Sequence, residues 1–151
     1  MFLHSSPVRI ESEGNVLKEL TIEASVKNIS AVLAFVDGEL ETLECPMKAQ
    51  MQIDVAVDEL FSNIANYAYP GSTGSATIRI AFDPSDRFVS ITFVDSGIPY
   101  DPLQKPDPDT TLSAEERTVG GLGIFLVKKT MDDMIYKYEN RQNHLTIRKK
   151  I

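Results

Sequence analysis

Hydrophobic and polar positions repeat with two different periods along the chain, and these periods predict where helices and strands lie. Apolar residues recur at steps of three and four over residues 26–43 and 46–69, and again after residue 121, which predicts three helices. The first residues resemble a loose end or a short strand. A period of two predicts strands over residues 16–24, 75–82, 88–94, 134–138 and 145–151.

The order of these elements predicts an α+β fold in one domain that spans residues 1–151. We expect a two-layer α/β sandwich, in which about three helices cover one face of a mixed, mostly antiparallel sheet. Ser25 is a candidate cap for the first helix, and Pro70 with Gly71 closes the second. Residues 95–119 contain four prolines and form a long loop, which is typical of a functional lid or of disorder.

The second predicted helix carries an unusual row of polar side chains. At about 100° per residue, Glu59, Asn63 and Asn66 fall within a narrow sector away from the apolar stripe that includes Leu60 and Tyr67. The row offers one carboxylate that can accept a proton and amide oxygens that can bind a hard cation. The alternative is an ordinary solvated helix face that happens to contain two asparagines.

Two glycine-containing stretches are further candidates for ligand binding. Asp95 ends a predicted strand and is followed by Gly97, so its carboxylate could accept a hydrogen bond from an exocyclic amine of a flat base. Gly120, Gly121 and Gly123 precede the third helix, where backbone N–H groups can approach an anion. Arg117, just before them, could clamp a phosphate. The simpler readings are a turn-forming aspartate, glycines that ease a tight turn, and a solvated arginine.

Composition and charge exclude several classes of function. The chain has 151 residues, of which 42% are hydrophobic and 25% charged, with a net charge of −7. This charge argues against non-specific nucleic-acid binding and against docking on anionic membranes. A lone Cys45, no evident signal peptide and no apolar run long enough to span a bilayer lead us to expect a cytoplasmic protein.

Taken in order, these stretches resemble a known family. They are similar to the GHKL, or Bergerat-fold, ATP-binding domain shared by histidine kinases, gyrase and MutL, and more narrowly to bacterial anti-sigma factor serine/threonine kinases. Glu59 and Asn63 match the acid and the asparagine of the N-box, and Asp95 with Gly97 matches the first glycine box. Residues 98–102 resemble the lid entry, residues 116–124 the second glycine box, and residues 143–145 the last hairpin of the subfamily. Pro99 replaces a glycine that is frequent in the wider superfamily, and this replacement looks usual in the anti-sigma branch.

The resemblance implies transfer of the γ-phosphoryl group of ATP to a serine or threonine of a partner protein. Glu59 would be the catalytic base, Asn63 the Mg²⁺ ligand and Asp95 the reader of adenine. Gly120, Gly121 and Gly123 would hold the phosphates, with help from Arg117 and from Asn66. The implied partners are a STAS-type anti-anti-sigma protein and a sigma factor, and relatives suggest a homodimer.

A second functional class stays open at this point. The chain could be an interaction module that binds ATP only as a conformational ligand and phosphorylates nothing. The presence of Glu59 favours the kinase over this module. A fragment of a histidine kinase is a poorer match, because no phosphoacceptor helix with an exposed histidine is evident before the domain, and His4 lies in the loose start.

Overall fold

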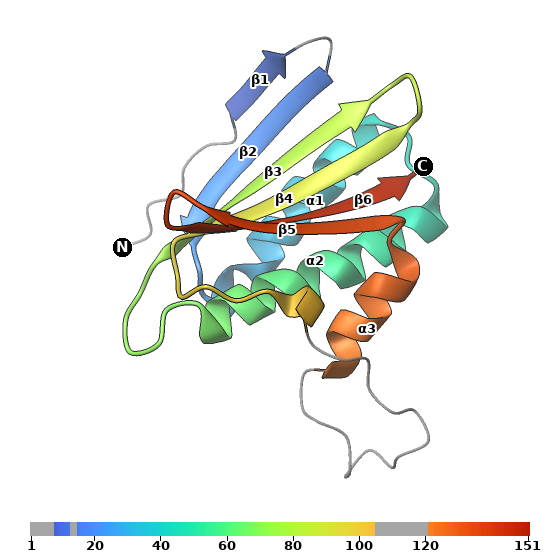
Figure 1. Ribbon diagram of the computed structural model, residues 1–151. Coiled ribbons are helices and arrows are strands. Elements are labelled where there is room, and N and C mark those ends of the chain that lie inside the picture. Colours follow the sequence, from blue (N-terminus) through green and yellow to red (C-terminus); the bar gives the residue numbers. More distant parts are fainter. Residues whose placement is uncertain (1–7, 13–14, 105–120) are drawn as a thin grey trace, which may run out of the picture.

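The computed structural model describes residues 8–12, 15–104 and 121–151, which form a sheet and three helices (Figure 1). The predicted order of elements is confirmed within these ranges. The strands are β1 (Val8–Ser12), β2 (Asn15–Glu23), β3 (Ser75–Asp83), β4 (Phe88–Asp95), β5 (Asp133–Glu139) and β6 (Gln142–Lys150). The helices are α1 (Ile29–Thr42), α2 (Met47–Tyr67) and α3 (Gly121–Thr130), with short 3₁₀ turns at Val26–Asn28 and Pro102–Gln104.

The strands form one six-stranded sheet in the order β1-β2-β3-β4-β6-β5. Every pairing between neighbouring strands is antiparallel in the described part of the chain, whereas a mixed sheet was expected. The reason lies in the position of β6. The β4 and β5 strands run in the same direction, as a connection through the single helix α3 allows, but β6 lies between them and pairs antiparallel with both.

All three helices lie on one side of the sheet, and the core fills the space between the two layers (Figure 1). The predicted alternation of buried and more exposed positions is confirmed over residues 75–80 of β3 and 88–93 of β4, whereas Val94 near the end of β4 is buried as well. The helices contribute one apolar stripe each. The innermost core residues are Val32, Val36, Leu40, Ile53, Ala56, Val57, Leu60, Phe61, Ala76, Ile78, Ile80, Val89, Ile91, Phe93, Ile124, Val127 and Ile147.

The start of the first helix differs from the prediction that Ser25 caps it. Ser25 makes no side-chain capping hydrogen bond, and the chain first forms a 3₁₀ turn before α1 begins at Ile29. The side chain of Asn28 makes a local hydrogen bond instead, because its amide donates to the backbone oxygen of Glu23 at a distance of 2.9 Å. The end of β2 is thus tied to the beginning of α1 by Asn28.

The last hairpin is tighter than the sequence suggested, and the difference changes the site. The predicted strands end at residue 138 and begin again at residue 145, but the turn between the observed strands consists only of Asn140 and Arg141, whose φ angles are 54° and 61°. Two consecutive residues in the left-handed region match the compact turn that joins twisted antiparallel strands. As a result Asn143 belongs to β6, opposite Asp95 on β4.

The other face of the sheet carries polar side chains that pair with one another across strands. Thr21 bonds to Thr77, and Thr92 to Thr146, with oxygen–oxygen distances of 2.8 Å in both pairs.

Among the described residues no helix is both long enough and apolar enough to cross a membrane.

Candidate functional site

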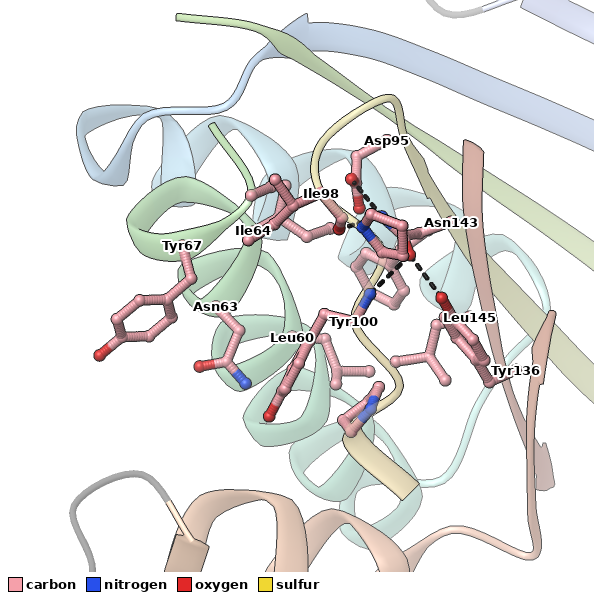
Figure 2. Close-up of a pocket in the computed structure, with 14 residues that line it drawn as sticks. Leu60, Asn63, Ile64, Tyr67, Asp95, Ile98, Tyr100, Tyr136, Asn143 and Leu145 are labelled. Carbon is pink, nitrogen blue, oxygen red and sulfur yellow. Dashed lines mark hydrogen bonds between the residues drawn. The ribbon is translucent and has the colours of Figure 1, made fainter. Parts of the chain in front are cut away.

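A cavity of about 410 Å³ opens beside the C-terminal half of α2, between this helix, the ends of β4 and β6, and the segment that follows β4 (Figure 2). Its walls are mostly apolar, and a few polar groups converge on it, which is the usual composition of a small-molecule site. The residues that line it are Leu60, Asn63, Ile64, Tyr67, Ala68, Phe93, Asp95, Ile98, Pro99, Tyr100, Pro102, Tyr136, Asn143 and Leu145.

Asp95 is the last residue of β4, as predicted, and lies at one end of the cavity with an exposed fraction of 6%. Its Oδ1 atom accepts two hydrogen bonds of 2.9 Å, from the backbone N–H of Gly97 and from the side-chain amide of Asn143. Both bonds use the same oxygen. Oδ2 therefore remains the acceptor that Asp95 can offer to a ligand.

Gly97 allows the chain after β4 to lie directly against the end of α2. A Cβ atom at this position would overlap with the backbone oxygen of Ala68 and come within 2.6 Å of its Cβ. The next residue, Ile98, donates its N–H to the same backbone oxygen over 2.9 Å. The glycine is thus needed for close approach of two backbones, as expected for a wall that must lie close to a flat ligand.

Asn143 is a central residue of the site that the sequence analysis did not single out as a ligand-site residue. It is 6% exposed, and its amide donates to Asp95 and to the backbone oxygen of Ile98, both over 2.9 Å. Its Oδ1 accepts from the N–H of Tyr100 at 3.1 Å and from the hydroxyl of Tyr136 at 2.5 Å (Figure 2). The available signal was the alternation that places Asn143 on the same face of β6 as the buried Leu145 and Ile147.

The polar row on α2 is divided among three environments. Asn63 lines the cavity, as expected for a residue that contacts a ligand. Glu59, one turn earlier, lies against Gly123 near the start of α3. Asn66 is exposed and does not line the cavity. The sector predicted from helical spacing is real, but only part of it borders the enclosed space.

The approach of α3 to α2 is closest at Gly123. A Cβ atom on Gly123 would overlap with the carboxylate of Glu59 and come within 2.7 Å of its Oε2. The absence of a side chain at Gly123 thus lets the first turn of α3 reach a carboxylate on the neighbouring helix. Gly121 is the first residue of α3, whereas Gly120 and Arg117 lie outside the described residues.

Tyr67 corrects one detail of the predicted apolar stripe on α2. It was assigned to the buried face, but its exposed fraction is 60% and it lines the mouth of the cavity instead. The stripe passes from the core to the cavity wall at this end of α2, because Ile64 packs against the core and also lines the cavity, and Tyr67 follows it on the same side. Tyr100, which is 41% exposed, also lines it.

Two phenol groups near Asp95 act as neutral hydrogen-bond donors. Burial raises the pKa of Tyr136, whose hydroxyl donates to Asn143. Burial also raises the pKa of Tyr69, whose hydroxyl donates to the backbone oxygen of Ser75 at 2.6 Å and accepts the N–H of Ser96 at 2.8 Å. These phenols therefore keep their protons at neutral pH and hold the chain on both sides of Asp95.

The donor set suits a magnesium ion that arrives with phosphates. Within the described ranges, no group of three histidine, cysteine, aspartate or glutamate side chains is arranged to hold a metal by itself. Asn63 offers a neutral amide oxygen at the cavity wall, and Mg²⁺ commonly takes one or two protein oxygens together with phosphate oxygens and water. A nucleotide with its metal fits this arrangement better than a resident metal ion does.

Comparison with known proteins agrees with this geometry. A family model described as the histidine kinase-like ATPase domain matches residues 22–149. The chain is 30% identical to the serine/threonine-protein kinase BtrW of Bordetella bronchiseptica over 130 residues, which cover 84% of this chain and 90% of the relative. It is 26% identical to the serine-protein kinase RsbW of Oceanobacillus iheyensis over 121 residues, which cover 77% of this chain and 75% of the relative. For the serine-protein kinase RsbW of Staphylococcus aureus, the identity is 25% over 124 residues, or 79% of this chain and 78% of the relative.

The family model covers most of the chain and includes α2, β4 and α3, the elements around the cavity. The relatives that align over most of their length carry protein kinase names. The chain therefore belongs to the histidine kinase-like, or GHKL, ATPase family, in the branch of the anti-sigma factor serine/threonine kinases, and is a protein serine/threonine kinase.

Proposed function

We propose that this chain transfers the γ-phosphoryl group of ATP to a serine or threonine of a STAS-type anti-anti-sigma protein. We also propose that it sequesters a sigma factor in the cytoplasm, so that the protein switches between these two partners. One observation supports the proposal above the others. The carboxylate of Glu59 lies against Gly123 at the start of α3, and one turn later Asn63 lines a cavity whose far end holds Asp95. This order along α2 and across the cavity supports the roles of base for Glu59, cation ligand for Asn63 and reader of adenine for Asp95, although Glu59 itself does not line the cavity.

Adenine recognition is assigned to Asp95 and the apolar walls around it. The exocyclic amine of adenine donates to Oδ2, because Oδ1 already accepts two protein donors. Leu60, Ile64 and Phe93 form the apolar surface on which the base lies. A site built around a buried acceptor discriminates strongly against a base that lacks the matching donor.

Phosphate binding is assigned to the start of α3 and to the facing side chains of α2. Gly121 and Gly123 lie at the N-terminal end of a ten-residue helix, where backbone N–H groups can bind the negatively charged phosphates of the nucleotide. Asn63 would hold Mg²⁺ through its amide oxygen, and the bound ion would supply neutralisation of the negative charge on the phosphates. Gly120, Arg117 and Asn66 complete this part of the proposal as further phosphate contacts.

Glu59 is assigned the role of general base. Its carboxylate accepts the proton of the acceptor hydroxyl as that oxygen attacks the γ-phosphorus and the bond to the β-phosphate oxygen breaks. The contact with Gly123 supports this role, because it places the carboxylate beside the backbone that holds the phosphates. Phosphoryl transfer requires mainly positioning and charge neutralisation, which these residues provide.

The test is phosphoryl transfer by a Glu59→Gln variant, measured as the mass of the phosphorylated partner after incubation with ATP, Mg²⁺ and candidate STAS proteins. Loss of a general base should lower the transfer rate by about 10²- to 10⁴-fold while the affinity for ATP stays nearly unchanged. Asp58→Asn is the matched control, since Asp58 is exposed on the same helix and bonds only to Ser62 among the described contacts. Undiminished transfer by the Glu59 variant would exclude this residue as the base. Wild-type protein that binds ATP but modifies no STAS partner would point to the interaction module instead.

A further inference from the structure

The amide of Asn143 uses its entire hydrogen-bonding capacity within the protein. An asparagine side chain has two N–H donors and an oxygen with two lone pairs, and four protein partners occupy them. The orientation of the amide is unambiguous, because the N–H of Tyr100 can only donate and the backbone oxygen of Ile98 can only accept. Asn143 therefore has no free group for a ligand and can influence binding only through its partners.

The first of these partners is the carboxylate that reads the base. Asp95 and Asn143 are directly opposite each other in the register of β4 and β6, and the amide bonds to Oδ1 over 2.9 Å. The N–H of Gly97 bonds to the same oxygen. These two donors determine how the plane of the carboxylate is turned, and thereby direct the available Oδ2 atom.

The second group of partners forms a wall of the cavity. Asn143 accepts from Tyr100 and donates to Ile98, and both of these residues line the cavity although they are 41% and 52% exposed. With so much of their surface in solvent, packing alone holds this segment weakly. A single buried amide thus holds both the base-reading carboxylate and the adjacent wall.

We infer that Asn143 is a positioning residue for base specificity: it presents Asp95 to the exocyclic amine of adenine and fixes the Ile98–Tyr100 wall against the same base. The inference rests on the proposed function, since it assumes that a purine nucleotide occupies the cavity. Tyr136 supports Asn143 by donating its hydroxyl to the Oδ1 of Asn143 at 2.5 Å. The residue acts through others and is not a catalytic residue.

The experiment compares ATP with inosine triphosphate, which has the same ribose and triphosphate but carries a carbonyl oxygen in place of the amine. Dissociation constants are measured by calorimetry for the wild type and for Asn143→Ala, together with the melting temperature of each protein. The wild type should prefer ATP by about 10- to 100-fold, the range for a hydrogen bond to a charged acceptor. The variant should lose most of this preference, to less than about 3-fold, mainly because ATP binds more weakly.

Two further variants separate positioning from general damage. Tyr136→Phe removes only the donor that supports Asn143, so it should lower the preference in the same direction by a smaller factor; it also serves as the test if Asn143→Ala does not fold. Thr146→Ala, on the outer face of the same strand, should retain the wild-type preference.

The outcomes distinguish this inference from the proposed function. An equal loss of affinity for both nucleotides in the Asn143 variant, or an unchanged preference, would overturn the positioning role while the nucleotide site stands. A wild-type protein that binds neither nucleotide, or does not prefer ATP, would overturn the assignment of the adenine site and this inference with it.

Discussion

Two carboxylates at opposite ends of the helix α2, the buried Asp95 beside it and the partly buried Asp54 on it, have opposite surroundings. Near the C-terminal end of α2, Asp95 meets donors: the amide of Asn143 and the N–H of Gly97. In the N-terminal half, Asp54 lies beside Asp37 of α1, and a buried Oδ1 atom of each has no hydrogen-bond partner among the described residues. The carboxylate of Asp95 therefore faces hydrogen-bond donors, whereas the carboxylate of Asp54 faces another acceptor.

The difference shows what each place can do. An acceptor whose inner oxygen is already satisfied by neutral donors offers its other oxygen to a ligand without a rearrangement of the protein. Two carboxyl groups that face each other can share a hydrogen bond only if one keeps a proton. Burial, followed by the neighbouring Asp37, raises the pKa of Asp54 from 3.8 to about 7. The first arrangement suits recognition, and the second makes the packing of α1 on α2 depend on pH.

The largest effect is expected from removal of the negative charge at the recognition end. Asp95→Asn can keep an acceptor towards Asn143, but it then presents an N–H group to the amine of adenine, so donor faces donor. The affinity for ADP, measured by calorimetry, should fall by about 10- to 100-fold. Asp101→Asn is the control, because Asp101 bonds within its own turn to the N–H of Leu103. Equal affinities of the Asp95 variant and the wild type would remove Asp95 from the site.

The next effect contrasts two glycines, one beside Asp95 and one beside the Asp37–Asp54 pair. Gly97→Ala must push the chain away from the backbone oxygen of Ala68, so we expect a loss of about 1–3 kcal/mol in the free energy of unfolding. Gly38, next to Asp37 on α1, has open space where a Cβ would be placed. Gly38→Ala should therefore stabilise the protein by about 0.5–1 kcal/mol. Urea denaturation of both variants measures the difference, and similar changes in both would contradict the tight contact at Gly97.

Local sequence signals were sufficient for much of the recognition end. The position of Asp95 at the end of a strand was predictable, because it depends on neighbours within a few residues. Gly97 was recognisable by its place just after Asp95, but the reason a glycine is needed there is a tertiary contact with the backbone of Ala68. The face of α2 that carries Asn63 followed from helical spacing alone. These predictions depend on periods and turns that a short segment of chain determines by itself.

The partners of Asn143 were not predictable in this way. Asp95 is 48 residues from Asn143 in the sequence and Ile98 is 45 residues away, and they meet because β6 lies between β4 and β5. The Asp37–Asp54 pair likewise arises from the packing of two helices whose faces were known separately. Both features depend on tertiary contacts, which one sequence without homologues does not specify.

A smaller effect concerns the phenol that supports the recognition end. Tyr69→Phe leaves the N–H of Ser96 and the backbone oxygen of Ser75 without their partner. These groups are near solvent, so water replaces part of what is lost, and the free energy of unfolding should fall by about 1 kcal/mol. Tyr138→Phe on the exposed part of β5 is the control and should change it little. If both variants unfold at the same urea concentration as the wild type, the phenol of Tyr69 contributes nothing to holding β4.

The smallest effect is expected from the carboxyl pair, because both side chains are only partly buried and water screens their repulsion. Since the pKa of Asp54 is higher in the folded protein than in the unfolded chain, the folded state binds the proton more tightly, and wild-type stability should decline as the pH rises from about 4 to about 7. Asp54→Asn removes this proton and gives Asp37 a donor, so the variant should melt about 2 °C higher than the wild type at pH 8.

The pH dependence separates this cause from a general gain in packing. Cys45 is an ionisable group close to Asp54: burial, followed by the charge of Asp54, raises the pKa of the Cys45 thiol, and the charge of Arg87 lowers it. Asp37→Asn should produce the same change as Asp54→Asn, and the double variant should add little, because either substitution alone removes the repulsion. Melting curves at pH 5 and pH 8 decide the matter. A variant whose advantage is equal at both pH values would show that Asp37 and Asp54 do not share a proton, and that the two ends of α2 do not differ in the way their carboxylates are held.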